Sequence, residues 1–187
     1  DFIAEMAFNQ AATPKINPVS HPQHLAISPF NPIKFKVDQQ AAPIESTSAK
    51  LAYDALKSTL STMIDNQNLL SQLTAYLYVL HNQNRPLLLI GEDALDIAQL
   101  AALRLTGQPA VQIECTDSFS ATVCQELQAI ESSVIVLNNL VGSAWLSHIN
   151  SLVHLPNKWL ILTESFNDDL NLAPLGLYNF ATPIFTD

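Results

Sequence analysis

Residues 86–115 decide the fold, and they read PLLLIGEDAL DIAQLAALRL TGQPAVQIEC. The apolar run at 86–90 predicts a buried strand that is closed by Gly91. Residues 94–105 have the apolar spacing of a helix, which a turn signal containing Gly and Pro ends before a second apolar run at 110–115. A strand, a helix and another strand in succession predict two parallel strands joined by a crossover helix.

The same alternation continues toward the C-terminus. The strands are apolar on both faces, which is typical of a parallel sheet covered by helices on both sides. The sequence therefore predicts an α/β fold with three layers. The further elements it predicts are helices at 118–130 and 143–155 and strands at 134–137, 159–163 and 183–185.

The N-terminal part of the chain has a different composition. Residues 1–45 hold six of the eleven prolines and no glycine, which favours an extended, Pro-rich linker or arm over a packed element. From residue 46 onward, apolar side chains recur at three- and four-residue spacing. We therefore expect one domain at 46–187, with a helical lead-in at 48–81 and a sheet core at 86–187.

Charge excludes one large class of function. The chain of 187 residues carries 17 acidic and 8 basic side chains, a formal net charge of −9. All of the excess lies in residues 86–187, where only Arg104 and Lys158 face eleven carboxylates. Because a polyanion repels nucleic acid, we expect no direct nucleic-acid binding by this segment.

Two other features of the sequence indicate in which cell compartment the protein is expected. No apolar run approaches the length of a membrane-spanning helix, so no membrane association is expected. Cys115 and Cys124 could form at most one disulfide, and Cys124 lies inside a predicted helix. A reducing compartment, the cytoplasm, is the simplest expectation.

Candidate site residues lie where the strands end, because ligands of α/β sheets bind beyond the carboxyl ends of parallel strands. A phosphate loop needs several glycines, a Lys for the phosphate charge and a Ser or Thr for magnesium. The loop that starts at Gly91 has one glycine and three carboxylates, and no Lys occurs between Lys57 and Lys158. The strand-end groups are Gly91-Glu92-Asp93-Ala94, Thr116-Asp117, Asn138-Asn139 and Glu164-Ser165.

The order of these blocks resembles the AAA+ domain of bacterial sigma-54-dependent transcription activators. The resemblance covers roughly residues 66–187. The family pattern runs strand, G-E-x-G-x-G-K, helix, S-G-x-P-F-V-x-I-N-C, then G-G-T-L-F-L-D-E-I, a sensor strand ending in T-N, and L-Y-Y-R-L-x-V-F-P-I. The matching segments here are 88–92, 106–115, 132–140, 160–165 and 177–184.

The resemblance implies a P-loop NTPase fold, with ATP and magnesium as the cofactors of the family. It assigns Gly91 to Ala94 to a degenerate phosphate-loop position, Asn138 and Asn139 to the position of the acidic pair, and Glu164 and Ser165 to the sensor position. The family Lys falls on Ile97 or Leu95, no Arg follows Arg104, and the segment before Ser133 has no room for the loop that engages sigma factor.

We therefore expect a transcription-regulator module that does not hydrolyse ATP. It would have no catalytic residue, no metal site and no bound cofactor, and would act through protein contacts. The expected partners are copies of itself or a paralogous AAA+ regulator.

Two alternatives remain open from the sequence. Glu92, Asp93 and Asp117 could form a cation or small-ligand site in a receiver-like α/β module. Glu92, Asp93 and Asp96 could instead simply begin a helix, where carboxylates are favourable. Asn138 and Asn139 could be the relic of a metal site or a strand end that caps the next turn.

Overall fold

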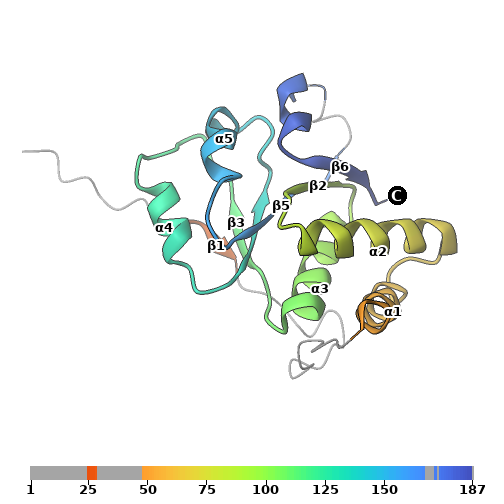
Figure 1. Cartoon of the computed structure of the whole chain (residues 1–187). Coiled ribbons are helices and arrows are strands. Elements are labelled where there is room, and N and C mark those ends of the chain that lie inside the picture. Colours follow the sequence, from red (N-terminus) through yellow and green to blue (C-terminus); the bar gives the residue numbers. More distant parts are fainter. Residues whose placement is uncertain (1–24, 29–47, 167–170, 172, 187) are drawn as a thin grey trace, which may run out of the picture.

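The predicted first strand, Leu87–Ile90 (β2), lies inside a six-stranded sheet of order β1-β3-β4-β5-β2-β6 (Figure 1). The computed structural model describes residues 25–28, 48–166, 171 and 173–186. Strands β3, β4, β5, β2 and β6 pair in parallel, and β1 pairs with β3 antiparallel. The other strands are Ile27–Ser28 (β1), Val111–Glu114 (β3), Val134–Asn138 (β4), Trp159–Glu164 (β5) and Thr182–Phe185 (β6).

The described part of the chain also contains five α-helices and two 3-10 helices, so the α/β class predicted from the sequence is confirmed. None of these helices is both long and apolar enough to cross a lipid bilayer. The α-helices are Ala49–Leu60 (α1), Gln67–Asn82 (α2), Ala94–Thr106 (α3), Val123–Ala129 (α4) and Ile149–Leu152 (α5), and the 3-10 helices are Ala144–His148 (η2) and Leu175–Asn179 (η4).

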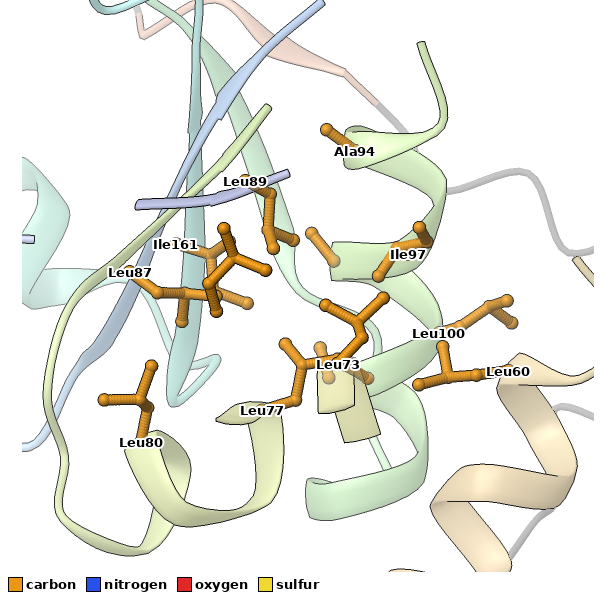
Figure 2. Packing of buried hydrophobic residues seen from close by; sticks show 14 of the residues in the cluster. Leu60, Leu73, Leu77, Leu80, Leu87, Leu89, Ala94, Ile97, Leu100 and Ile161 are labelled. Carbon is orange, nitrogen blue, oxygen red and sulfur yellow. The ribbon is translucent and has the colours of Figure 1, made fainter. Parts of the chain in front are cut away.

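Helices cover both faces of the sheet because strand side chains alternate between them. On one face, here called the α3 face, Leu87 and Leu89 of β2 pack in a cluster with α1, α2 and α3 (Figure 2). On the other, the α5 face, Leu88 and Ile90 pack in a second cluster with α4, α5 and η4. Strands that are buried on both faces explain the continuous apolar runs of the sequence.

The predicted helical lead-in at 48–81 consists of α1 and α2, whose buried side chains belong to the cluster on the α3 face. The break between them is set by Asn66, whose side-chain oxygen accepts hydrogen bonds from the backbone amides of Asn68 and Leu69 (3.0 and 3.1 Å) and caps α2. Leu56 and Leu60 of α1 and Leu77 of α2 are fully buried. The helical pair is therefore part of the domain core.

A short piece of the predicted N-terminal arm joins the sheet. Ile27 pairs with Ile113 at the edge of β3, and the carbonyl of Ala26 accepts from the amide of Glu114 at 3.0 Å. The prolines of this part of the chain are compatible with an edge strand but not with a central one. The rest of the predicted linker at 1–45 lies outside the described residues.

Two predicted helices are wrong in extent. The helix predicted at 118–130 begins only at Val123, because hydroxyl groups before it bond locally instead, as between Ser120 and Thr122 (2.8 Å). The carbonyl of Ser118 accepts from the indole of Trp145 at 3.0 Å. The helix predicted at 143–155 is a 3-10 turn followed by the short α5.

His81, in the last turn of α2, makes the stability of the fold depend on pH. Its ring lies edge-on to Trp159, with centroids 4.8 Å apart, and burial lowers the pKa of His81, partly offset by a hydrogen bond with Asn82. Below about pH 6.5 the unfolded chain takes up a proton here that the folded chain resists, so the free energy of unfolding falls as the pH drops.

Urea unfolding at about pH 7.5 and about pH 5.5 measures this effect. His81→Phe keeps a ring against Trp159 but cannot titrate, so the variant should lose less stability than the natural chain over this interval. Equal losses in both chains would contradict a titrating His81.

Candidate functional site

The ends of β2 and β5 form the place where a ligand of this sheet would be expected. The two strands are neighbours, but the connection after β2 leads to α3 on one face, whereas the connection after β5 leads to η4 on the other. In open α/β sheets, ligands bind outside the carboxyl ends of the strands at such a reversal. This end of the sheet is called the carboxyl edge below.

The connection between β2 and α3 is only three residues long, Gly91-Glu92-Asp93. Gly91 has a φ of 139°, a conformation that favours glycine. Its amide donates to the carbonyl of Glu164 at 2.9 Å, and the amide of Ala94 donates to the carbonyl of Gly91 at 3.1 Å. Two amides of the predicted phosphate-loop position are therefore already used within the protein, and the exposed side chains there are the carboxylates of Glu92 and Asp93.

The positions assigned to the family Lys lie in or against the core. Ile97 is fully buried on the inner side of α3, within the cluster that contains Leu89 (Figure 2). Leu95 is partly buried and packs against the same cluster. An ammonium group at Ile97 would be removed from water without a partner, which is strongly unfavourable.

At the carboxyl ends of β3, β4 and β5 the sheet carries a row of three polar side chains, Glu114, Asn138 and Thr163, here called the polar row. The strand register places Glu114 beside Asn138 and Asn138 beside Thr163. The amide of Asn138 donates to Glu114 Oε2 (2.8 Å), and the hydroxyl of Thr163 donates to Asn138 Oδ1 (2.8 Å). Each of the three groups therefore has a partner in its neighbour along the row.

Asn139 completes this network from the next turn. It has a φ of 55°, which Asn adopts more readily than most residues, and its backbone amide donates to the carbonyl of Thr163 at 3.0 Å. Its side-chain amide donates to Glu114 Oε1. Asn138 and Asn139, which the sequence predicted at the acidic-pair position, therefore both donate to one carboxylate, which a pair of acidic residues would repel.

Glu164 and Ser165, predicted at the sensor position, are not part of the polar row. Glu164 is almost fully buried, and its carboxylate accepts from the backbone amide of Val141 at 2.6 Å. Ser165 follows the end of β5. The residue that meets Asn138 is Thr163, which the sequence interpretation missed together with Glu114.

Cys115 lies at the end of β3 next to these carboxylates and is buried. Burial, and then the negative charges of Glu114 and Glu164, raise the pKa of this thiol far above its ordinary range. Because the thiolate is the nucleophile, Cys115 is held in its unreactive form.

The acidic residues of the receiver-like alternative are not brought together. Glu92 and Asp93 follow β2, whereas Asp117 follows β3, and both β5 and β4 lie between them. At about 4.8 Å per strand this separates the two strand ends by roughly 14 Å. Among the described residues, no group of three or more His, Cys, Asp or Glu side chains could hold a metal ion.

The basic side chains of 86–187 lie at the opposite end of the sheet. Lys158 precedes β5, where its ammonium group donates to the carbonyls of Ile130 and Ser132 (the latter at 2.9 Å). Arg104 is in the last turn of α3, which runs away from the carboxyl edge. The exposed carboxylates of Glu92 and Asp93 at the carboxyl edge are therefore not neutralised by these two basic groups.

A hollow of about 260 Å³ lies beside the end of β3, where residues of the arm meet η2. Its lining combines apolar side chains with hydroxyl groups and one carboxylate, from Leu25, Ala26, Glu114, Thr116, Ser118, Val123 and Trp145.

Comparison with known proteins leaves the family open. No protein-family model matches the chain. No curated protein matches it. A solved structure of the Drosophila ORC bound to AT-rich DNA and Cdc6 is weakly similar, with 11% identity and a TM-score of 0.42. The similarity covers 77% of this chain and 59% of that one, and at this strength it does not establish a shared fold.

Proposed function

We propose that the chain is a regulatory module that acts through protein contacts and does not hydrolyse nucleotide. The observation that supports this proposal is the set of hydrogen bonds within the protein at the carboxyl edge. Gly91 and Ala94 have their amides bonded within the protein, and Asn138 and Asn139 donate their side-chain amides to Glu114. Two amides of the predicted phosphate-loop position and both asparagines of the predicted acidic-pair position are therefore engaged within the protein.

Electrostatics supports the same conclusion. A triphosphate at this edge would meet the exposed carboxylates of Glu92 and Asp93, while the nearest basic groups of the sheet core lie at the other end of the strands. Two like charges about 4 Å apart repel by several kcal/mol when partly shielded from water. Binding would need a cation that these residues do not supply.

We further propose that the module is a degenerate AAA+ domain of the sigma-54 activator type. Three of its resembling segments, 88–92, 132–140 and 160–165, fall on β2, β4 and β5, which are consecutive in the sheet. Their ends meet at the carboxyl edge, where a phosphate loop, an acidic pair and a sensor have to meet in order to work. Copies of the chain or a paralogous regulator would be its partners.

A nucleotide titration tests the proposal. We expect no saturable binding of magnesium-ATP by the full chain up to about 1 mM in calorimetry, the range in which a weak ligand is still detected. The variant with Glu92→Gln and Asp93→Asn removes the local charge but leaves the amides bonded, so it should also fail to bind.

An active P-loop ATPase measured in parallel serves as the positive control. Micromolar, magnesium-dependent binding by the natural chain would overturn the proposal. A rise in melting temperature with magnesium chloride alone would point instead to the receiver-like alternative, since a ligand that binds only the folded state stabilises it.

A further inference from the structure

The hollow beside the end of β3 has room for a small ligand. Its volume is about 260 Å³. A water molecule takes up roughly 30 Å³ in the liquid, so the space corresponds to about eight waters or one small organic molecule. Leu25 and Ala26 of the arm form one wall, next to the place where β1 pairs with β3, and Trp145 of η2 forms another. The proposed function makes no use of this space.

Three hydrogen-bond donors of the lining are already used within the protein. The indole N–H of Trp145 donates to the carbonyl of Ser118 at 3.0 Å, and the hydroxyl of Thr116 donates to the same carbonyl at 3.2 Å. The backbone amide of Glu114 donates to the carbonyl of Ala26 at 3.0 Å. What these groups still offer a ligand is oxygen lone pairs, because a hydroxyl oxygen also accepts.

Glu114 adds a negative charge to the lining. Its carboxylate accepts from the side-chain amides of Asn138 and Asn139, which are neutral groups. Because a carboxylate has about four lone-pair sites, these two bonds leave it able to accept others. None of the described lining residues is a Lys, Arg or His. Asp117, which is exposed, lies between two lining residues and makes the local potential more negative.

We propose that the hollow binds a small organic cation, a primary ammonium group on a short apolar stem. The ammonium has three donors. It would donate to the carboxylate of Glu114 and to the hydroxyl oxygen of Thr116, the acceptors that the lining keeps available. The stem would lie against the apolar part of the lining, Leu25, Val123 and Trp145. The ligand thereby contacts the arm, the end of β3 and η2 together.

The composition of the lining disfavours other classes of small ligand. An anion would meet the carboxylate of Glu114 without a basic group to offset the repulsion. A divalent metal ion needs several charged or imidazole ligands, and the described residues contain no group of three or more His, Cys, Asp or Glu that could supply them. One carboxylate beside apolar side chains suits a single positive charge on an apolar body.

NMR of the ¹⁵N-labelled full chain tests the inference, because the chain has two tryptophans and their indole N–H signals report on two places. Trp145 lines the hollow, whereas the indole of Trp159 donates to the carbonyl of Arg85 at the other end of the sheet. The variant Trp159→Phe identifies the second signal by removing it.

The probe is n-butylamine at about pH 8, where an alkylamine is charged and an ordinary histidine is not. We expect it to shift the Trp145 signal saturably, with a dissociation constant on the order of 1 mM, and to leave the Trp159 signal in place. n-Butanol has a similar stem without the charge and should bind at least about tenfold more weakly.

The same ammonium group occurs on free amines and on the lysine side chains of other proteins. Nα-acetyl-lysine methylamide, which presents it on a peptide unit, separates these two sources. Binding of either compound supports the site. Tighter binding of the lysine derivative would identify a protein side chain as the source, and tighter binding of n-butylamine would identify a free amine.

Two variants of the lining should weaken n-butylamine binding. Glu114→Gln removes the charge and should weaken it at least about tenfold. Thr116→Val removes the hydroxyl acceptor but leaves the bonds between Glu114 and the asparagines, and it should weaken binding at least about threefold. Glu131→Gln is the matched control, because Glu131 is exposed, lies outside the hollow and loses the same charge. It should bind like the natural chain.

The backbone amide signals of each variant show whether it is folded, and Thr116→Val carries the test if Glu114→Gln is not. The inference would be overturned by an unsaturable or absent shift at Trp145, by equal shifts at both indoles, by equal binding of n-butanol, or by equal losses in the lining variants and in Glu131→Gln. The measurement involves neither nucleotide nor a protein partner, so its result is separable from the ATP titration.

Discussion

Asn138→Asp is expected to lower the free energy of unfolding by about 2–3 kcal/mol at neutral pH. The substitution removes the amide that donates to Glu114 at 2.8 Å and puts a second carboxylate in its place. The hydroxyl of Thr163 can still donate to the new group, so the loss is confined to the pair with Glu114. Urea unfolding followed by tryptophan fluorescence measures it.

Glu114→Gln provides the decisive second variant. On its own it weakens the bonds from both asparagines, but combined with Asn138→Asp it supplies an amide that can donate to the new carboxylate. The double variant should therefore recover most of the loss, which makes the two effects non-additive. Additive effects, or an Asn138→Asp chain as stable as the natural one, would show that the polar row does not hold these strand ends together.

Leu77→Ala should cost about 3 kcal/mol of stability, the typical loss for a fully buried leucine. Leu77 is 0% exposed and lies between α2 and the sheet in the cluster that also holds Leu73 and Leu80 (Figure 2). Truncation leaves a cavity among side chains from α2, α3 and β2 that cannot all move inward. Urea unfolding at neutral pH gives the value.

Val79→Ala is the matched control on the same helix, because Val79 is 46% exposed. Its effect should stay within about 0.5 kcal/mol. A comparably small effect of Leu77→Ala would mean that α1 and α2 are attached to the domain but are not part of its core.

The strands were predictable because a strand buried on both faces is apolar at every position. This pattern can be recognised without knowing which strands lie beside it. Leu87 to Ile90 are apolar without interruption, and so are Val134 to Leu137. The short helices on the α5 face were less predictable. Trp145 and Val123 are buried in the same cluster, but their backbone conformations depend on local hydroxyl bonds and on the indole bond to Ser118. Apolar spacing cannot distinguish such a segment from a regular helix.

The positions of the site residues along the chain could be predicted, but the residues that lie beside them on neighbouring strands could not. Gly91 and Asn138 follow apolar strands, so their places at the carboxyl edge could be inferred from the sequence. Glu114 and Thr163 became recognisable only when the register put them on either side of Asn138. Strand order sets such neighbours, and a single sequence contains no direct record of it. The same strand order separates Glu92 from Asp117, two residues that the sequence suggested could form one site.

The brevity of the turn between β2 and α3 has an evolutionary consequence. If the chain descends from an ATPase, point mutation alone offers a poor route back. A lysine at Ile97 would enter the core, and the turn would still have no spare residues with which to wrap a phosphate. Regaining the ancestral activity would require an insertion, a new cation and release of the asparagines from Glu114, with little benefit until all three were present. A turn of three residues would thus make loss of such an activity difficult to reverse by single substitutions.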